Sequence, residues 1–229
     1  MASLREGYRA LVIGASGAIG QACVQALRQD ARCAEVQAVS RGRPVAWDLS
    51  DQESLARLAG LLPGPWHLVV DATGALGLEG HGPEKRLQEL DAERLARSLQ
   101  VNAIGPALLL QKLSPQLARG ERAIWAKLSA RVGSIEDNHK GGWYGYRAAK
   151  AALNQLLQTA AIELSRQRPL AVVAALQPGT VRSALSQPFV GDDALAPSQS
   201  VHGLLQALDA APATGRALFL DLRGQSIPW

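Results

Sequence analysis

Short apolar runs alternate with longer segments of helical character along most of the chain. The runs LVIG, LVVDA and LAVVAAL are almost continuously apolar, which is typical of strands covered on both faces of a sheet. The pattern predicts strands over residues 8–13, 35–39, 66–70, 122–128, 170–176 and 216–221. It predicts helices over residues 18–29, 52–60, 91–117, 144–168 and 198–209, with a bend near Gly105 and Pro106.

This alternation of strands and helices predicts an α/β fold, in which a doubly wound parallel sheet carries helices on both faces. Ligands of such sheets bind at the carboxyl ends of the strands, near the point where the strand order reverses. We therefore expect the functional residues in the loops that follow the strands.

Composition and charge argue against several other classes of protein. Of the 229 residues, 47% are hydrophobic and 19% are charged, which does not fit a disordered chain. The longest apolar run, residues 170–176, is too short to span a membrane. The net charge of +4 is scattered, so no nucleic-acid surface is indicated. The N-terminus lacks an apolar signal core, and the two cysteines, Cys23 and Cys33, lack metal-ligand spacing; both features favour a reduced cytoplasmic setting.

A glycine-rich loop, GASGAIG over residues 14–20, follows the first predicted strand. Glycines at a strand-to-helix turn let a pyrophosphate approach the backbone, and the helix N-terminus supplies amides and the positive end of its dipole. The alternative is a plain turn, but the position of the loop in the strand–helix pattern favours a dinucleotide site.

The loop after the second strand lacks the acidic residue that holds the ribose hydroxyls in sites that prefer NAD. Ser40 and Arg41 occupy this place, and a guanidinium suits the 2′-phosphate of NADP because it is planar, charged and a multiple donor. The alternative for Arg41 is a solvated surface side chain, and Arg43 takes the role if the strand ends later.

Two further loops carry candidate cofactor contacts. Asp48 is placed to accept a hydrogen bond from an adenine amine, or it belongs to a helix-capping region in which Ser50 is the cap. Ala72, Thr73 and Gly74 follow the third strand, and their small side chains let a cofactor pass close to the backbone.

Tyr146 and Lys150 lie four residues apart at the start of a predicted helix and therefore share one face. An ammonium beside a phenol lowers the phenol pKa from about 10. Such a tyrosine transfers protons near neutral pH. A pair of this kind is common on protein surfaces, but together with the glycine loop it predicts catalysis.

These motifs resemble those of the short-chain dehydrogenase/reductase family over nearly the whole chain. The resemblance also rests on Asn102 and on Pro178–Gly179. Residues 128–135 (LSARVGSI), 141–147 (GGWYGYR) and the C-terminal FLD and IPW are similar to the C-factor-like and sniffer-like carbonyl reductase branch. The resemblance implies one Rossmann-like domain over residues 1–229, with a nucleotide-binding part over about 8–120 and a catalytic and substrate part over about 121–229.

The resemblance further implies NADP-dependent reduction of a carbonyl by hydride transfer, or oxidation of the corresponding alcohol, with Tyr146 as proton donor or acceptor. Lys150 would bond the nicotinamide ribose. Asn102 would hold a water of a proton relay, or it is an interior amide bonded to backbone. The implied catalytic residues are Tyr146, Lys150, Asn102 and Ser129. The implied cofactor-binding residues are Gly14, Ser16, Gly17, Ala18, Ile19, Gly20, Ser40, Arg41, Asp48, Leu49, Ala72, Thr73, Gly74, Tyr146, Lys150, Pro178, Gly179 and Val181.

Three departures from the family pattern stand out. Ala18 replaces a loop glycine, and Asp71 replaces an asparagine and either disturbs the cofactor or caps a turn. The third is Ala130, which occupies the usual place of the catalytic serine. Ser129 or Ser134 would have to supply the hydroxyl, but strand alternation argues against Ser129. Since losing an oxyanion-type donor costs on the order of a hundredfold in rate, a slow enzyme is one expectation.

The resemblance also implies partners. The substrate is expected to be a small or medium carbonyl compound or alcohol, covered by a lid over residues 181–197 that carries Pro188, Phe189 and Gly191. Helices 91–117 and 144–168 are expected to pack into a homodimer or homotetramer. The alternative function is that of a C-factor-like, nucleotide-bound signalling or regulatory protein with little or no turnover.

Overall fold

The computed structural model describes residues 1–78, 80–183 and 194–229. Its strands are β1 (Tyr8–Ile13), β2 (Cys33–Val39), β3 (Leu68–Asp71), β4 (Ala123–Leu128), β5 (Ala171–Gln177) and β6 (Leu218–Asp221). Its α-helices are α1 (Ala18–Gln29), α2 (Gln52–Gly60), α3 (Ala92–Leu99), α4 (Gly105–Leu113), α5 (Tyr144–Ser165) and α6 (Pro197–Ala210). Within these ranges no helix has the length and apolar character needed to cross a bilayer.

The six described strands form one parallel sheet in the order β2-β1-β3-β4-β5-β6. The chain runs from β1 to β2 on one side and then to β3 on the other, so the strand order reverses between β1 and β3. The loops after these two strands therefore flank the crevice in which doubly wound sheets bind their ligands.

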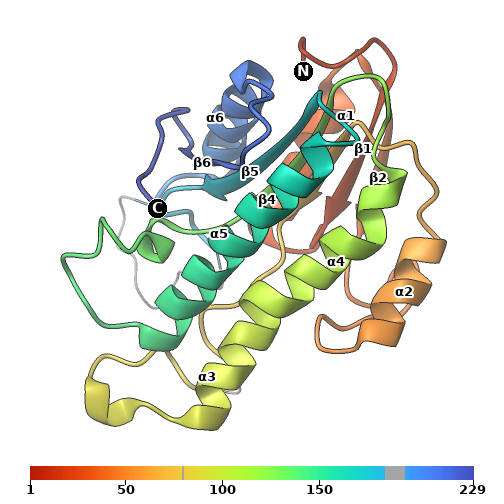
Figure 1. Ribbon diagram of the computed structural model, residues 1–229. Coiled ribbons are helices and arrows are strands. Elements are labelled where there is room, and N and C mark those ends of the chain that lie inside the picture. Colours follow the sequence, from red (N-terminus) through yellow and green to blue (C-terminus); the bar gives the residue numbers. More distant parts are fainter. Residues whose placement is uncertain (79, 184–193) are drawn as a thin grey trace.

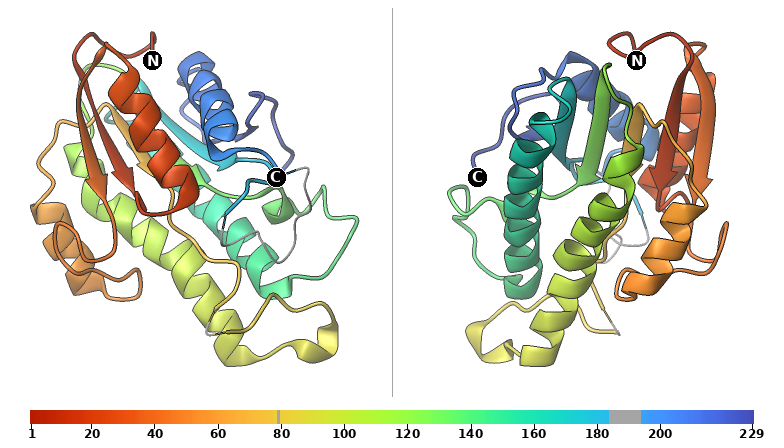
Figure 2. Two further views of the ribbon diagram at one scale, coloured as in Figure 1. Left: turned by 180° about the vertical axis from the view of Figure 1, so that it is seen from behind. Right: turned by 45° about the vertical axis from the view of Figure 1, so that its right-hand side comes forward.

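Side chains along each strand alternate between two hydrophobic cores. Leu11, Val69 and Trp125 belong to the core under α2, α4 and α5. Val12 and Val70 belong to the core under α1 and α6. Figures 1 and 2 show α4 and α5 crossing one face of the sheet and α1 and α6 crossing the other. The predicted fold, a doubly wound parallel sheet with helices on both faces, is confirmed.

The predicted long helix over residues 91–117 is divided by a π-helical turn, Gln100–Ile104, that joins α3 to α4. Pro106 has no amide proton, so it cannot donate to the carbonyl of Asn102 four residues earlier. The irregular turn therefore begins ahead of the predicted bend, and it contains Asn102.

Candidate active site

A cavity of about 280 Å³ lies at the carboxyl edge of the sheet, at the point where the strand order reverses. It brings together residues from the loops after β1, β2 and β3 and from the helical segment that contains Arg97 and Val101. Nine of the predicted cofactor-binding residues line it: Gly14, Ser16, Gly17, Arg41, Asp48, Leu49, Ala72, Thr73 and Gly74. Sequence reasoning missed five further lining residues, Trp47, Ala75, Leu78, Arg97 and Val101.

Close backbone approach around the glycine loop leaves no room for side chains there, which is the local structure that a dinucleotide site needs. Gly14 has a φ of 82°, and a Cβ there would lie 3.0 Å from the carbonyl carbon of Ala72. A Cβ on Gly20 would lie 2.1 Å from the carbonyl oxygen of Gly14. The glycines thus let the loop pack closely against the backbone of the Ala72 loop and of Gly14 itself. Gly17 precedes the first turn of α1, which includes Ala18, Ile19 and Gly20. The amides of that first turn are available to a phosphate.

Arg41 and Asp48 occupy the same cavity, whereas Ser40 does not line it. The carbonyl of Ser40 accepts a hydrogen bond from the indole of Trp47 at 2.8 Å. Hydrogen bonds from Ser50 hold the pKa of Asp48 below its usual range, helped by the charges of Arg97 and Arg41. Asp48 therefore stays ionised and able to accept hydrogen bonds.

The cap of α2 differs from the expectation. The Asp51 carboxylate, rather than Ser50, accepts from the amides of Glu53 and Ser54, at 3.0 and 3.1 Å. Ser50 instead donates to Asp48, which lines the cavity.

The predicted nicotinamide turn follows β5. Pro178 accepts from Ser200 at 2.6 Å, Gly179 has a φ of 78°, and Val181 forms a bridge with Leu195. None of the three is among the residues that line the cavity described above. The predicted lid residues Pro188, Phe189 and Gly191 lie outside the described residues.

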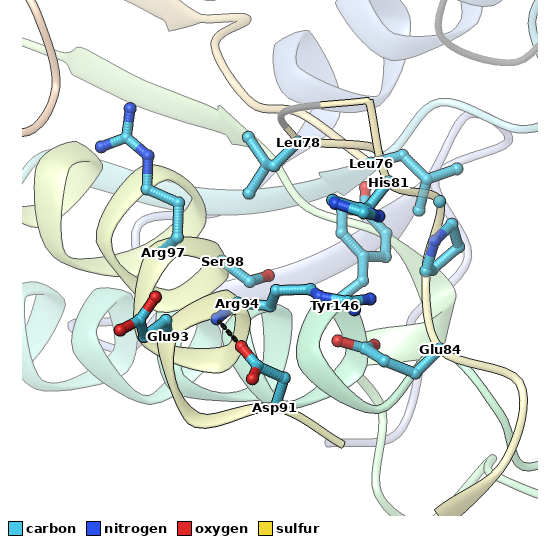
Figure 3. A pocket seen from close by; sticks show the side chains of 12 residues that line it. Leu76, Leu78, His81, Glu84, Asp91, Glu93, Arg94, Arg97, Ser98 and Tyr146 are labelled. Carbon is cyan, nitrogen blue, oxygen red and sulfur yellow. Dashed lines mark hydrogen bonds between the residues drawn. The ribbon is translucent and has the colours of Figure 1, made fainter. Parts of the chain in front are cut away.

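A second cavity, of about 420 Å³, contains Tyr146. Figure 3 shows the phenol pointing towards Leu76 and His81, while Arg94 and Ser98 approach it from α3. Leu78 and Arg97 line both this cavity and the cofactor cavity. The two sites are therefore neighbours, as a reaction between a cofactor and a substrate requires.

Tyr146 and Lys150 lie on one face of α5, but the expected lowering of the phenol pKa is wrong for this arrangement. Burial raises the pKa of Tyr146 to about 12. The ammonium nitrogen of Lys150 lies 5.5 Å from the centre of the Tyr146 ring and donates to the carbonyl of Leu128 at 3.0 Å. Burial and the charge of Lys127 lower the pKa of Lys150 to about 7, against the opposing effect of Asp71. Lys150 is thus a weakened source of positive charge.

Asn102 is fully buried in the π-helical turn, and its side-chain amide pairs with backbone. Its Oδ1 accepts from the Ala75 amide at 3.0 Å, and its Nδ2 donates to the Ala75 carbonyl at 2.9 Å. This arrangement matches the alternative reading of an interior amide. It also fixes the loop after β3 beside Lys150, since a Cβ on Gly74 would lie 3.2 Å from Asn102 Oδ1 and 3.5 Å from Lys150 Nζ.

The structure does not bring Ser129 to the cavity beside Tyr146. Its hydroxyl donates to Asn154 at 2.7 Å in the core, because neighbouring residues of an extended strand point to opposite faces. Ser134 is also engaged: its hydroxyl accepts from the Asp137 amide at 3.0 Å. These placements do not support either serine as the replacement for the hydroxyl missing at Ala130.

Sequence reasoning missed Glu84 and Lys127. Helix α5 begins after Trp143, whose side chain does not cap it, and Glu84 accepts from the Gly145 amide at 3.0 Å instead. A helix start without a capping side chain was the signal for such a distant partner.

Lys127 pairs with Asp71 at 3.0 Å in the core. The signal for this pair was an isolated lysine in an apolar strand.

Comparisons with known proteins agree with this geometry. The family model described as enoyl-(acyl carrier protein) reductase matches residues 10–221. C-signal of Myxococcus xanthus is 31% identical over 166 residues, covering 72% of this chain and 94% of that protein. A carbonyl reductase from Pseudomonas aeruginosa PAO1, solved in complex with NADP, is 26% identical with a TM-score of 0.73 and covers 97% of this chain and 99% of that chain. Carbonyl reductase Sniffer of D. melanogaster, at 20% identity, shares the fold with a TM-score of 0.83, covering 98% of this chain and 100% of that chain.

Proposed function

The chain belongs to the short-chain dehydrogenase/reductase family, and from that premise we propose that it is an NADPH-dependent reductase of small or medium carbonyl compounds. The single observation that carries this proposal is the adjacency of two cavities, one lined by the glycine loop and Arg41 and the other by Tyr146. The P. aeruginosa carbonyl reductase, solved with NADP, supports the choice of cofactor.

The residues of the first cavity would hold the dinucleotide. The first turn of α1 and Gly14 receive the pyrophosphate, Asp48 accepts from the adenine amine, and Arg41 binds the 2′-phosphate. When bound, the cofactor supplies a hydride to the carbonyl carbon. Lys150, whose ammonium nitrogen lies close to Gly74, would bond the nicotinamide ribose.

Tyr146 is suited to give a proton rather than to take one. With a pKa raised to about 12, the phenol stays neutral through the physiological range. A neutral phenol can protonate the alkoxide that forms during reduction, whereas oxidation of an alcohol needs the phenolate as base. Carbonyl reduction thus uses the phenol in the neutral form that burial stabilises, whereas alcohol oxidation would need the phenolate that burial disfavours.

The second cavity indicates the size of the substrate. A volume of about 420 Å³ falls within the range of small-molecule sites. Its lining is mixed: Leu76 and Leu78 are apolar, Ser98 and His81 are polar, and the charged side chains are Glu84, Asp91, Glu93, Arg94 and Arg97. A substrate of medium size that carries polar groups fits this lining.

The test is NADPH consumption with a panel of aldehydes and ketones by the wild type and Tyr146→Phe. Loss of a general acid typically costs about 10²- to 10⁴-fold, so the variant should turn over at most about 1% as fast. Phe keeps the ring, so NADPH affinity, followed by fluorescence titration, should stay within about threefold. Equal rates in the two proteins would remove the assigned chemistry.

A second function, that of a nucleotide-bound signalling protein with little turnover, is favoured by one observation. Ala130 occupies the serine position, and neither Ser129 nor Ser134 lies in the cavity beside Tyr146. C-signal, a relative at 31% identity, carries a signalling name. Tight NADPH binding without turnover on the whole panel would support this function, and brisk turnover would exclude it.

We also propose a homodimer or homotetramer that works in the cytoplasm. A groove between α4 and α5 is lined by Leu110, Leu153, Leu156 and Leu157. Leu156 and Ile162 are exposed on α5, at 40% and 41%. Apolar surface of this kind is commonly covered by another subunit. Light scattering should give a multiple of the 24.2 kDa chain mass, and Leu156→Glu should shift it to the monomer.

A further inference from the structure

A buried ion pair lies in the core within electrostatic reach of Lys150. Lys127 on β4 and Asp71 at the end of β3 are 1% and 0% exposed at their side chains, and Lys127 Nζ lies 3.0 Å from Asp71 Oδ1. Removing two charges from water is costly, and a pair of leucines would fill such a core position without that cost. The pair is therefore a feature that core packing alone does not explain.

Every proton of the Lys127 ammonium is used in one short turn. Besides Asp71, it donates to the Thr73 carbonyl at 2.6 Å and to the Thr73 hydroxyl at 2.9 Å. The same Asp71 oxygen accepts from the Thr73 amide at 2.9 Å and from its hydroxyl at 2.6 Å. Asp71 thus caps the turn, which is one of the two roles expected for it from the sequence. Lys127, on β4, donates further hydrogen bonds to the same turn.

The turn formed by Asp71 and Thr73 continues into Gly74, which lies beside Lys150 and Asn102. Gly74 follows Thr73, and a Cβ on it would lie 3.5 Å from Lys150 Nζ and 3.2 Å from Asn102 Oδ1. The other carboxylate oxygen, Asp71 Oδ2, is buried with no hydrogen-bond partner among the described residues. The Asp71 carboxylate also acts electrostatically on Lys150, although it is paired with Lys127.

We propose that the Asp71–Lys127 pair is a positioning element of the proposed reductase. It holds the Thr73–Gly74 turn against Lys150, and its two charges determine how readily Lys150 stays protonated. This inference rests on the proposed function for its catalytic meaning. Lys127 and Asp71 are not proposed to contact the substrate or the reacting atoms. They act indirectly, by positioning the Thr73–Gly74 turn and by their charges on Lys150.

The charges around Lys150 give this proposal a direction. In the described structure, Lys127 faces it from β4, Asp71 from β3 and the Tyr146 ring from its own helix. Like charge from Lys127 lowers the pKa of Lys150, and opposite charge from Asp71 raises it by less. Lys127→Gln removes the repulsion and leaves the attraction, so the ammonium of Lys150 should persist to higher pH.

The experiment is a side-chain NMR titration of the full chain without cofactor, made with labelled lysine. The chain has five lysines, so each signal can be assigned by single substitution. In Lys127→Gln the midpoint of Lys150 should rise by about one pH unit. In the double variant Asp71→Asn/Lys127→Gln, which leaves no unpaired buried charge, it should fall between those of the wild type and Lys127→Gln. Lys112→Gln on α4 is the matched control and should leave it unchanged.

The alkaline limb of the pH–rate profile for carbonyl reduction should move in the same order among these variants. Where Lys127→Gln fails to fold, the double variant carries the test, because its midpoint should still exceed that of the wild type. An unchanged or lowered Lys150 midpoint in either variant overturns the inference. Absence of turnover with the predicted midpoints overturns the proposed function alone, because the titration does not need turnover.

Discussion

The cofactor cavity and the proton-transfer region lie side by side but are built from different materials. The cofactor cavity consists mostly of backbone, small residues and exposed charged groups such as Arg41 and Asp48. The proton-transfer region consists of buried charges, Lys127, Lys150 and Asp71, each 2% exposed or less. In the first region the charged groups are exposed and stay ionised, whereas in the second burial opposes the charge of Lys127 and Lys150.

The largest expected effect on turnover comes from placing a hydroxyl at position 130, where this chain has alanine. Ala130 is extended, with φ of −159° and ψ of 146°, and points away from the face on which Ser129 bonds Asn154. Ala130→Ser should raise kcat for carbonyl reduction on the order of a hundredfold if this face meets the substrate carbonyl. Steady-state kinetics with NADPH in excess measures the change.

Ser129→Ala is the control for that gain. It removes the hydrogen bond to Asn154 and should cost about 1–3 kcal/mol of unfolding free energy while changing turnover little. A large loss of turnover in Ser129→Ala, with no gain in Ala130→Ser, would return the catalytic role to Ser129.

Arg41→Ala tests the exposed side of the comparison. Removing a charge-assisted hydrogen bond costs about 1.5–3 kcal/mol, or roughly ten- to a hundredfold in the dissociation constant of NADPH. NADH, which has no 2′-phosphate, should bind within about twofold of the wild type. Arg43→Ala is the matched control on the same loop, and a larger effect there would move the phosphate site to Arg43.

Glu84→Gln should give the smallest change, because Gln keeps an acceptor for the Gly145 amide and removes only the charge. A carboxylate at a helix N-terminus contributes about 0.3–1 kcal/mol, and up to about 2 kcal/mol when partly buried. Urea unfolding should show a loss of this size, with less in the exposed Glu93→Gln of α3. No loss in Glu84→Gln would mean that the carboxylate charge does not support the start of α5.

Local pattern was enough to predict the fold and much of the cofactor cavity. Apolar runs and helical periods depend on neighbours along the chain, so α1 and α2 have the predicted bounds, Ala18–Gln29 and Gln52–Gly60. The loops after β1 and β3 also meet as predicted, because the strand order requires it.

Tertiary structure alone decided the ionisation and direction of the buried groups. The spacing of Tyr146 and Lys150 predicted a shared face, but burial set a phenol pKa of about 12 and turned the ammonium to the Leu128 carbonyl. Likewise, nothing local pairs Asp71 with Lys127, which are 56 residues apart. A pKa depends on solvent exclusion and on charges brought near by the fold, and sequence spacing encodes neither quantity.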